Sequence, residues 1–124
     1  MIVLDHTVVA AADNERAARR FAETMGLAFE GFDGVDGKFA TVRVNDRLRL
    51  FFATAERVTT QHLAFAVDGL RFDGIVERLR AAGQPFGPSP RDVTSGRTDH
   101  PLATRGVLWV DPDGHLLEVL TDAP

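Results

Sequence analysis

The 124-residue chain contains no cysteine and no tyrosine, and it has no surplus of positive charge. Without cysteine there is no disulfide, no thiolate metal ligand and no cysteine nucleophile. The formal net charge of −4 provides no basic surface that would indicate nucleic-acid binding. No apolar run approaches the length of a membrane-spanning helix, and no signal-peptide pattern precedes the first predicted strand. We therefore expect a cytoplasmic protein that binds neither nucleic acid nor membranes.

What is present is the composition of a soluble globular chain, with 44% hydrophobic and 26% charged residues. An internal repeat divides this chain, because His6 and His62 begin two similar stretches. In each copy a predicted strand leads into an amphipathic segment that stops at glycine. The first segment has Asp13 or Asn14 as its N-cap, Gly26 just past its end, and one apolar helical face: Ala17, Ala18, Phe21, Ala22 and Met25. The second has Asp68 as its cap, Gly83 past its end, and the apolar face Phe72, Ile75, Val76, Leu79 and Ala82. A short apolar piece (27–29 and 84–86) and a hairpin follow. Each copy therefore predicts a β-α-β-β-β unit, about 1–53 and 60–122, and the two units together predict one domain over residues 1–124.

Three residues of metal-ligand type lie in three separate predicted strands: His6 in 2–9, His62 in 61–67 and Glu118 in 115–120. Two imidazoles and one carboxylate form a facial ligand set that leaves coordination positions open on a divalent ion. Iron, manganese, nickel, cobalt and zinc all accept such ligands, and their affinity order does not select one of them.

Side chains alternate between the two faces of a strand, so each candidate ligand has predictable neighbours. Leu4 and Val8 share the face of His6, Ala64 shares that of His62, and Leu116 and Leu120 share that of Glu118. Small and apolar neighbours around polar ligands are typical of a small-molecule pocket. The predicted pocket lining is completed by Leu50 from the closing hairpin of the first unit and comprises Leu4, Val8, Leu50, Ala64, Leu116 and Leu120.

The paired units, their opening histidines and the string Asp111-Pro112-Asp113-Gly114-His115-Leu116-Leu117-Glu118 resemble the vicinal oxygen chelate superfamily. That superfamily includes glyoxalase I, extradiol dioxygenases, fosfomycin-resistance enzymes and bleomycin-resistance proteins. The resemblance covers nearly the whole chain. It implies an α+β fold in which two βαβββ units form a curled mixed sheet, a partly open barrel, around a cleft.

The resemblance also implies four ligand positions, of which this chain fills three. Aligning the closing strands of the two units places Leu50 opposite Glu118, so the first unit lacks a carboxylate. This departure disfavours glyoxalase I, which uses two glutamates. Extradiol dioxygenases and fosfomycin-resistance enzymes use two histidines and one glutamate. The chain departs from the first by lacking tyrosine, and from the second by having Val8 where a hydroxyl residue is expected.

Two functions remain open. The first is a small glyoxalase- or dioxygenase-like metalloenzyme that chelates a substrate through vicinal oxygens, with isomerase, lyase, transferase or ring-cleaving chemistry. The second is a metal-free protein, similar to bleomycin-resistance proteins, that sequesters a small molecule. Either protein is expected to be a homodimer, whose units pair within one chain or across two.

No catalytic acid or base is assigned from the sequence. His100, in the polar loop 89–105, is a candidate for an acid/base role, although a solvated loop histidine is the simpler interpretation. His115 belongs to the turn motif and is interpreted as a structural or surface residue.

Overall fold

The computed structural model describes all residues of the chain, Met1–Pro124, as two compact units. The first unit spans Met1–Thr59 and the second Thr60–Pro124. The boundary falls within the short polar segment that links the two sequence repeats. We describe each unit in turn.

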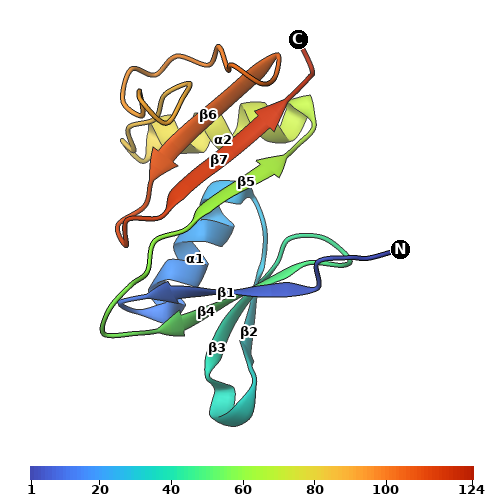
Figure 1. The fold of residues 1–124 in the computed structure, drawn as a ribbon, viewed down its shortest axis with the longest axis vertical. Coiled ribbons are helices and arrows are strands. Elements are labelled where there is room, and N and C mark those ends of the chain that lie inside the picture. The colour runs from blue at the N-terminus through green and yellow to red at the C-terminus, as the bar shows by residue number, and fades with distance from the viewer. The chain divides into compact units, whose positions relative to one another are not determined.

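The first unit is a four-stranded mixed sheet with one helix packed on it (Figure 1). Its elements are β1 (His6–Ala11), α1 (Asn14–Met25), β2 (Phe29–Asp33), a short 3₁₀ helix η1 (Val35–Gly37), β3 (Phe39–Arg43) and β4 (Arg49–Thr54). The strand order is β1-β4-β3-β2. β1 runs parallel to β4, and the other neighbours are antiparallel. The parallel pair places the first and last strands of the unit side by side.

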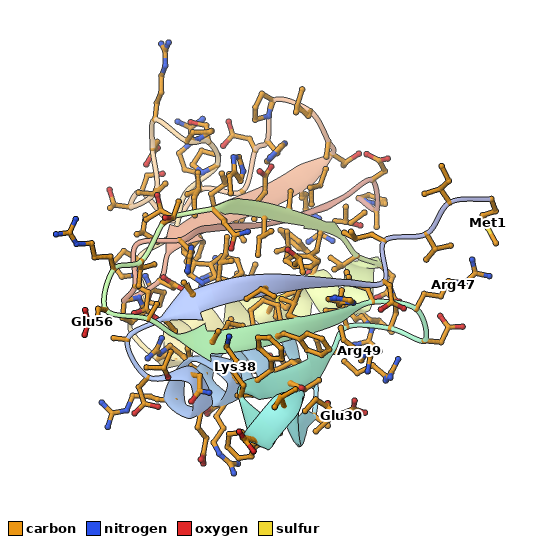
Figure 2. The ribbon with its side chains drawn as sticks, turned by 60° about the horizontal axis from the view of Figure 1, so that its bottom comes forward. Met1, Glu30, Lys38, Arg47, Arg49 and Glu56 are labelled. Carbon is orange, nitrogen blue, oxygen red and sulfur yellow. The ribbon has the colours of Figure 1, made fainter.

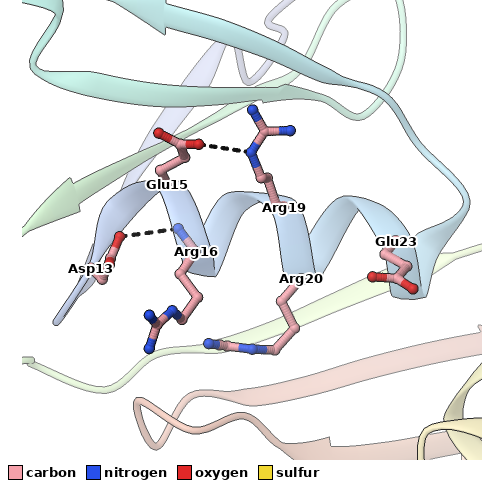
Figure 3. A pocket seen from close by; sticks show the side chains of 6 residues that line it. All are labelled: Asp13, Glu15, Arg16, Arg19, Arg20 and Glu23. Atoms are coloured by element: carbon pink, nitrogen blue, oxygen red, sulfur yellow. Dashed lines mark hydrogen bonds and ion pairs between the residues drawn. The ribbon is translucent and has the colours of Figure 1, made fainter.

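Helix α1 begins and ends where the sequence predicts. Asp13 is its N-cap, and the Asp13 side chain accepts a hydrogen bond from the backbone N–H of Arg16 at 3.1 Å. Gly26 ends the helix in the left-handed conformation, with φ 72°, which glycine adopts without steric cost. Charged side chains cover the exposed face and line a shallow surface pocket: Asp13, Glu15, Arg16, Arg19, Arg20 and Glu23 (Figure 3).

The core of the first unit lies between α1 and one face of its sheet. Alternate residues of β1, Val9 and Ala11, are buried, whereas His6 and Val8 on the other face are exposed. The ring of Phe52 on β4 lies 5.8 Å from that of Phe21 on α1. Complete burial of an aromatic or branched aliphatic side chain contributes about 1.5–3 kcal/mol. The predicted buried face of α1 is confirmed, with Ala17, Ala18, Phe21, Ala22 and Met25 all buried.

The second unit repeats this plan with three strands. Its elements are β5 (His62–Ala66), α2 (Gly69–Ala81), β6 (Arg105–Val110) and β7 (Leu116–Thr121). The order is β5-β7-β6, with β5 parallel to β7 and β6 antiparallel to β7 (Figure 1). Asp68 caps α2 by accepting the backbone N–H of Arg71 at 2.8 Å. The buried face of α2 is formed by Phe72, Ile75, Val76 and Leu79, whereas the predicted member Ala82 is the exposed C-cap.

The middle strand predicted at 84–86 is absent. A single isolated bridge, Gly87 with Leu108, stands in its place. Three prolines, Pro85, Pro88 and Pro90, fall in this short stretch. Proline has no backbone N–H and so cannot complete a ladder of hydrogen bonds. The prediction of β-α-β-β-β therefore holds for the first unit and is wrong for the middle strand of the second.

The α+β class with two repeated units is confirmed. The predicted first strand is shorter than expected, because β1 begins at His6 and the preceding apolar residues Met1, Ile2 and Leu4 are exposed. In this N-terminal region Nη1 of Arg47 lies 3.2 Å from the sulfur of Met1 (Figure 2). Neither helix is long and apolar enough to cross a membrane.

Candidate functional site

The parallel pair β5–β7 brings His62 and Glu118 onto one face of the second sheet. The register pairs His62 with Leu116, Ala64 with Glu118, and Ala66 with Leu120. These residues therefore share a face, as the sequence alternation predicts. Leu117 and Val119 of β7 have the opposite orientation and are buried on the side of α2.

His62 and Glu118 are in direct contact on this face. Nε2 of His62 lies 2.6 Å from Oε1 of Glu118. The His62 side chain is 48% exposed, whereas that of Glu118 is 9% exposed. An accessible imidazole thus lies above a carboxylate that is held almost completely inside the unit.

His100 binds the other oxygen of the same carboxylate. Nε2 of His100 lies 2.5 Å from Oε2 of Glu118, and the His100 side chain is 2% exposed. The interpretation of His100 as a solvated loop histidine is therefore wrong. Alternation cannot locate such a residue, because His100 lies outside any strand and is oriented by the path of its loop.

Gly106 on β6 makes room for the His100 ring. A Cβ at position 106 would overlap with atoms of this ring. The loop is also pinned by backbone bonds, from Gly106 N–H to the carbonyl of Thr98 at 2.9 Å and from Gly96 N–H to that of Phe86 at 2.7 Å. A glycine near the start of β6 (Arg105–Val110), before the apolar run 107–110, is the sequence signal that could have indicated this close approach.

Of the two interpretations offered for His115, structural or surface, the structure supports the first. It is 1% exposed, and its Nδ1 accepts the backbone N–H of Gln61 at 3.0 Å. Asp111 closes the preceding turn by accepting the backbone N–H groups of Asp113 and His115, both at 2.9 Å. The turn motif therefore sets the entry into β7, and with it the position of Glu118.

In the first unit, His6 is exposed at the start of β1 and is oriented by Asp5. Nδ1 of His6 lies 2.7 Å from Oδ2 of Asp5. The hydrogen bond from His6 and the nearby Arg49 guanidinium hold the pKa of Asp5 below its usual value. The carboxylate is therefore an acceptor at neutral pH, so Nδ1 of His6 carries the shared proton and Nε2 has the free lone pair in the neutral ring. Metal-binding histidines are commonly oriented in this way.

Asp5 was not identified from the sequence. Strict alternation predicts that it faces away from the side of His6. In the structure β1 begins at His6, so Asp5 lies before the strand and its side chain does not follow the alternation of strand faces. An open groove of about 630 Å³ adjoins it, lined by Met1, Val3, Asp5, Arg43, Asp46, Arg47 and Arg49. Arg43 and Arg49 are already paired with Glu30 and Asp5 respectively, at 3.4 Å each.

The alignment of Leu50 with Glu118 is wrong by one residue. In the second unit the strand that carries His62 places Ala64, two residues later, beside Glu118. In the first unit the residue two positions after His6 is Val8, which lies beside Phe51. Phe51 is therefore the counterpart of Glu118, and its ring centroid lies 4.8 Å from that of His6.

This correction also removes Leu50 from the predicted pocket lining. Leu50 is 1% exposed and pairs with Thr7, on the face opposite to that of His6. The conclusion that the first unit lacks a fourth carboxylate is unchanged, because Phe51 is also apolar. Leu108 pairs with Glu118 across β6 and β7 and so shares its face, but it is completely buried.

Of the remaining lining candidates, Val8 lies on the face of His6, and Ala64, Leu116 and Leu120 lie on that of His62 and Glu118, whereas Leu4 precedes β1 and is not placed by strand alternation. Leu4 and Val8 are 65% and 46% exposed in the first unit. Ala64 is exposed and Leu116 and Leu120 are half-buried in the second. The faces that carry the histidines are thus bordered by apolar side chains.

Comparison with solved structures assigns the family. Oxidase ChaP-H2 is 34% identical with a TM-score of 0.88, and the match covers 99% of this chain and 94% of that chain. Oxidase ChaP-H1 is 36% identical with a TM-score of 0.87, and the match covers 100% and 98%. A possible glyoxalase from Bacillus cereus is 26% identical with a TM-score of 0.69, covering 97% and 99%.

The chain belongs to the vicinal oxygen chelate superfamily. The resemblance inferred from the repeat and from the turn motif is confirmed. No protein-family model matches the sequence, and no curated protein matches it.

The donor chemistry at His62 and Glu118 fits the divalent ion that this superfamily implies. One imidazole nitrogen and one carboxylate oxygen converge from neighbouring strands on one face. Two donors that each bind an ion at about 2.1 Å, at a right angle to one another, lie roughly 3 Å apart. Nε2 of His62 and Oε1 of Glu118 are 2.6 Å apart, so they need to move only slightly further apart to bind one ion. No group of three or more His, Cys, Asp or Glu side chains is arranged to hold an ion in the structure.

Proposed function

We propose that this protein is a divalent-metal-dependent enzyme that oxidises a small molecule bearing two adjacent oxygens, with dioxygen as the oxidant. Its metal ligands would be His6, His62 and Glu118. The observation that carries the proposal is the convergence of His62 Nε2 and Glu118 Oε1 at 2.6 Å on one sheet face. The 34–36% identity with two chains named oxidases favours oxidation over isomerase, lyase or transferase chemistry.

His6 joins this set through its place in the repeat. It opens the first unit as His62 opens the second, and both lie on a strand that is parallel to the closing strand of the unit. Its Nδ1 is bound to Asp5, which leaves Nε2 as the nitrogen for a ligand bond.

In this proposal the protein binds the metal ion, orients the substrate and shields the site from water. Three ligands leave positions on the ion for two substrate oxygens, and the bound ion would supply Lewis acidity and a template. Ala64, Leu116 and Leu120 provide an apolar border that favours a flat or partly apolar substrate and excludes water. Catechol-like compounds, vicinal diols and hydroxy-ketones are the substrate classes that combine these features.

A glyoxalase I activity is disfavoured. Phe51 occupies the position that corresponds to Glu118, so a second carboxylate ligand is lacking. A site with one carboxylate has less negative charge around the ion than a site with two. We therefore expect poor turnover of the methylglyoxal–glutathione adduct.

Metal titration of the wild type and of His62→Ala tests the proposal. We expect one divalent ion per wild-type chain and greatly weakened uptake in His62→Ala. The matched control is Glu77→Ala, an exposed residue of α2 that is not a proposed ligand. Equal uptake by wild type and His62→Ala would contradict the proposed site.

Ligand binding then separates catalysis from sequestration. Calorimetric titration with a catechol should show binding to metal-loaded protein and loss of binding after chelator treatment. Tight binding that is indifferent to chelator would favour the alternative, a metal-free binding protein related to bleomycin-resistance proteins.

We also propose a homodimer, the assembly that the superfamily resemblance implies.

A further inference from the structure

The two oxygens of Glu118 have different surroundings. Oε1 faces the half-exposed ring of His62, and Oε2 faces the buried ring of His100. One oxygen is thus accessible from the sheet face, while the other is enclosed. A carboxylate with one enclosed, hydrogen-bonded oxygen is restricted to single-oxygen ligation through the other.

The hydrogen bonds of His100 define its tautomer. The backbone N–H of Leu102 donates to Nδ1 of His100 at 3.0 Å. Nδ1 must therefore have the lone pair, and in the neutral ring the proton is on Nε2. Nε2–H points at Oε2 of Glu118, so His100 is a donor to the carboxylate. No buried side-chain nitrogen or oxygen is left without a partner.

The same bonds argue against an acid/base role. To accept a proton, Nδ1 would have to give up the Leu102 N–H. To donate one to a substrate, Nε2 would have to leave Glu118. The ring is 2% exposed and lies against Gly106, so a substrate has little access to either nitrogen.

We propose that His100 is a positioning residue that fixes Oε2 of Glu118, so that Oε1 alone is presented to His62 and the metal. This inference rests on the proposed metal site and deepens it by adding a partner from a loop. Partners of this kind, which bind a metal ligand without touching the metal, typically change metal affinity or activity by about 10–100-fold when removed.

The path of the loop is consistent with this role. Gly87 and Leu108 exchange two backbone hydrogen bonds, of 3.0 and 2.8 Å, where the loop leaves the sheet. Gly106 N–H binds Thr98 O where the loop returns. His100 follows this anchor by two residues, so the backbone places the imidazole beside β7.

The test compares His100→Gln with His100→Leu. The Nε2 amide group of glutamine can replace the Nε2–H of histidine as a donor, whereas leucine cannot donate. We expect His100→Leu to bind Co²⁺ about 10–100-fold more weakly than wild type, and His100→Gln to remain within about threefold. The visible spectrum of the bound Co²⁺ should change in the leucine variant alone.

The matched control is Asp99→Asn. Asp99 is the preceding residue of the same loop and pairs with Arg97 at the surface, without contact to Glu118. We expect its Co²⁺ affinity and spectrum to equal those of wild type. Unchanged affinity in His100→Leu would overturn the positioning role, as would a glutamine variant that binds Co²⁺ normally but loses turnover, since that result indicates acid/base chemistry.

A measurement on the metal-free wild type keeps the two proposals distinguishable. Nitrogen-15 NMR of the ring should show His100 as the Nε2–H tautomer. An Nδ1–H tautomer would overturn the positioning role even if the protein binds metal at His62. Conversely, equal Co²⁺ uptake by wild type and His62→Ala would reject the metal site, while the tautomer still reports on the His100–Glu118 bond.

Discussion

At the scale of single residues, the proposed site depends on which atom each histidine presents. The sequence identified His6, His62 and Glu118 because strand alternation and the repeat limit where such side chains lie. It did not identify Asp5, which is hydrogen-bonded to His6, and it named His100 only as a candidate for an acid/base role rather than as the partner of Glu118. Both lie outside regular strands, where backbone path rather than periodicity determines side-chain direction. The error at Leu50 has a related origin, since a shift of one residue reverses the face of every side chain in a strand.

Asp5→Asn tests the orientation of His6. An amide in this place can donate as well as accept and has no charge, so it no longer favours the tautomer with the free lone pair on Nε2. We expect about a 10–100-fold loss in metal affinity, measured by Co²⁺ titration, with the fold retained. Asp46→Asn, in the same groove, is the control. Wild-type affinity in Asp5→Asn would show that Asp5 does not support a ligand.

At the scale of elements, the helices and outer strands follow from patterns that each segment carries by itself. Caps at Asp13 and Asp68 and apolar faces at helical spacing predicted α1 and α2. The strand predicted after α2 does not form, because three prolines in that stretch interrupt the hydrogen-bond ladder despite its apolar residues. The loop that replaces it is the element that places His100.

Gly106→Ala tests the close approach between β6 and this loop. The added Cβ would overlap with the His100 ring, so either the ring or the strand must move. We expect His100 to lose its bond to Glu118, with faster amide hydrogen exchange in residues 96–104 and weaker Co²⁺ binding. Val110→Ala, on the same strand and 42% exposed, is the control and should change neither quantity. Wild-type exchange rates in Gly106→Ala would contradict this packing.

Asp92 makes the stability of the loop sensitive to acid. Its carboxylate accepts the backbone N–H groups of Thr94 and Ser95 at 3.3 and 3.0 Å. Hydrogen bonds from Ser95, and then from Thr94, hold the pKa of Asp92 below its usual value of 3.8. The stabilisation is therefore complete above about pH 4 and is lost as the pH falls through the lowered folded-state pKa.

Urea unfolding of wild type and Asp92→Asn across this range measures the effect. We expect wild type to be the more stable protein at pH 6, and the difference between the two to shrink as the pH falls below 3.8. A difference that grows toward low pH would have the wrong sign for a carboxylate with a lowered pKa. Asp36→Asn, in the 3₁₀ helix of the first unit, serves as the exposed control.

At the scale of the whole molecule, the repeat divides the proposed ligands between two units. His6 belongs to Met1–Thr59, and His62 and Glu118 belong to Thr60–Pro124. The superfamily resemblance predicts that two such units form one domain with a partly open barrel. Both predictions depend on how the two units pair. Sequence periodicity acts within an element, so it predicts the faces that carry the ligands but not whether they pair in one chain or across two.

Sedimentation and subunit mixing address the pairing directly. We expect a homodimer, about twice the 13.5 kDa of the chain, and exposed apolar residues at its N-terminus, Met1, Ile2 and Leu4, favour association. A single 13.5 kDa species at micromolar concentration would refute this.

His6→Ala and Glu118→Ala homodimers should each lack metal-dependent turnover. If His6 of one subunit completes the site of its partner, a mixed dimer contains one site with both defects and one intact site, so mixing restores activity. If each site forms within one chain, both sites of the mixed dimer are defective and mixing restores none.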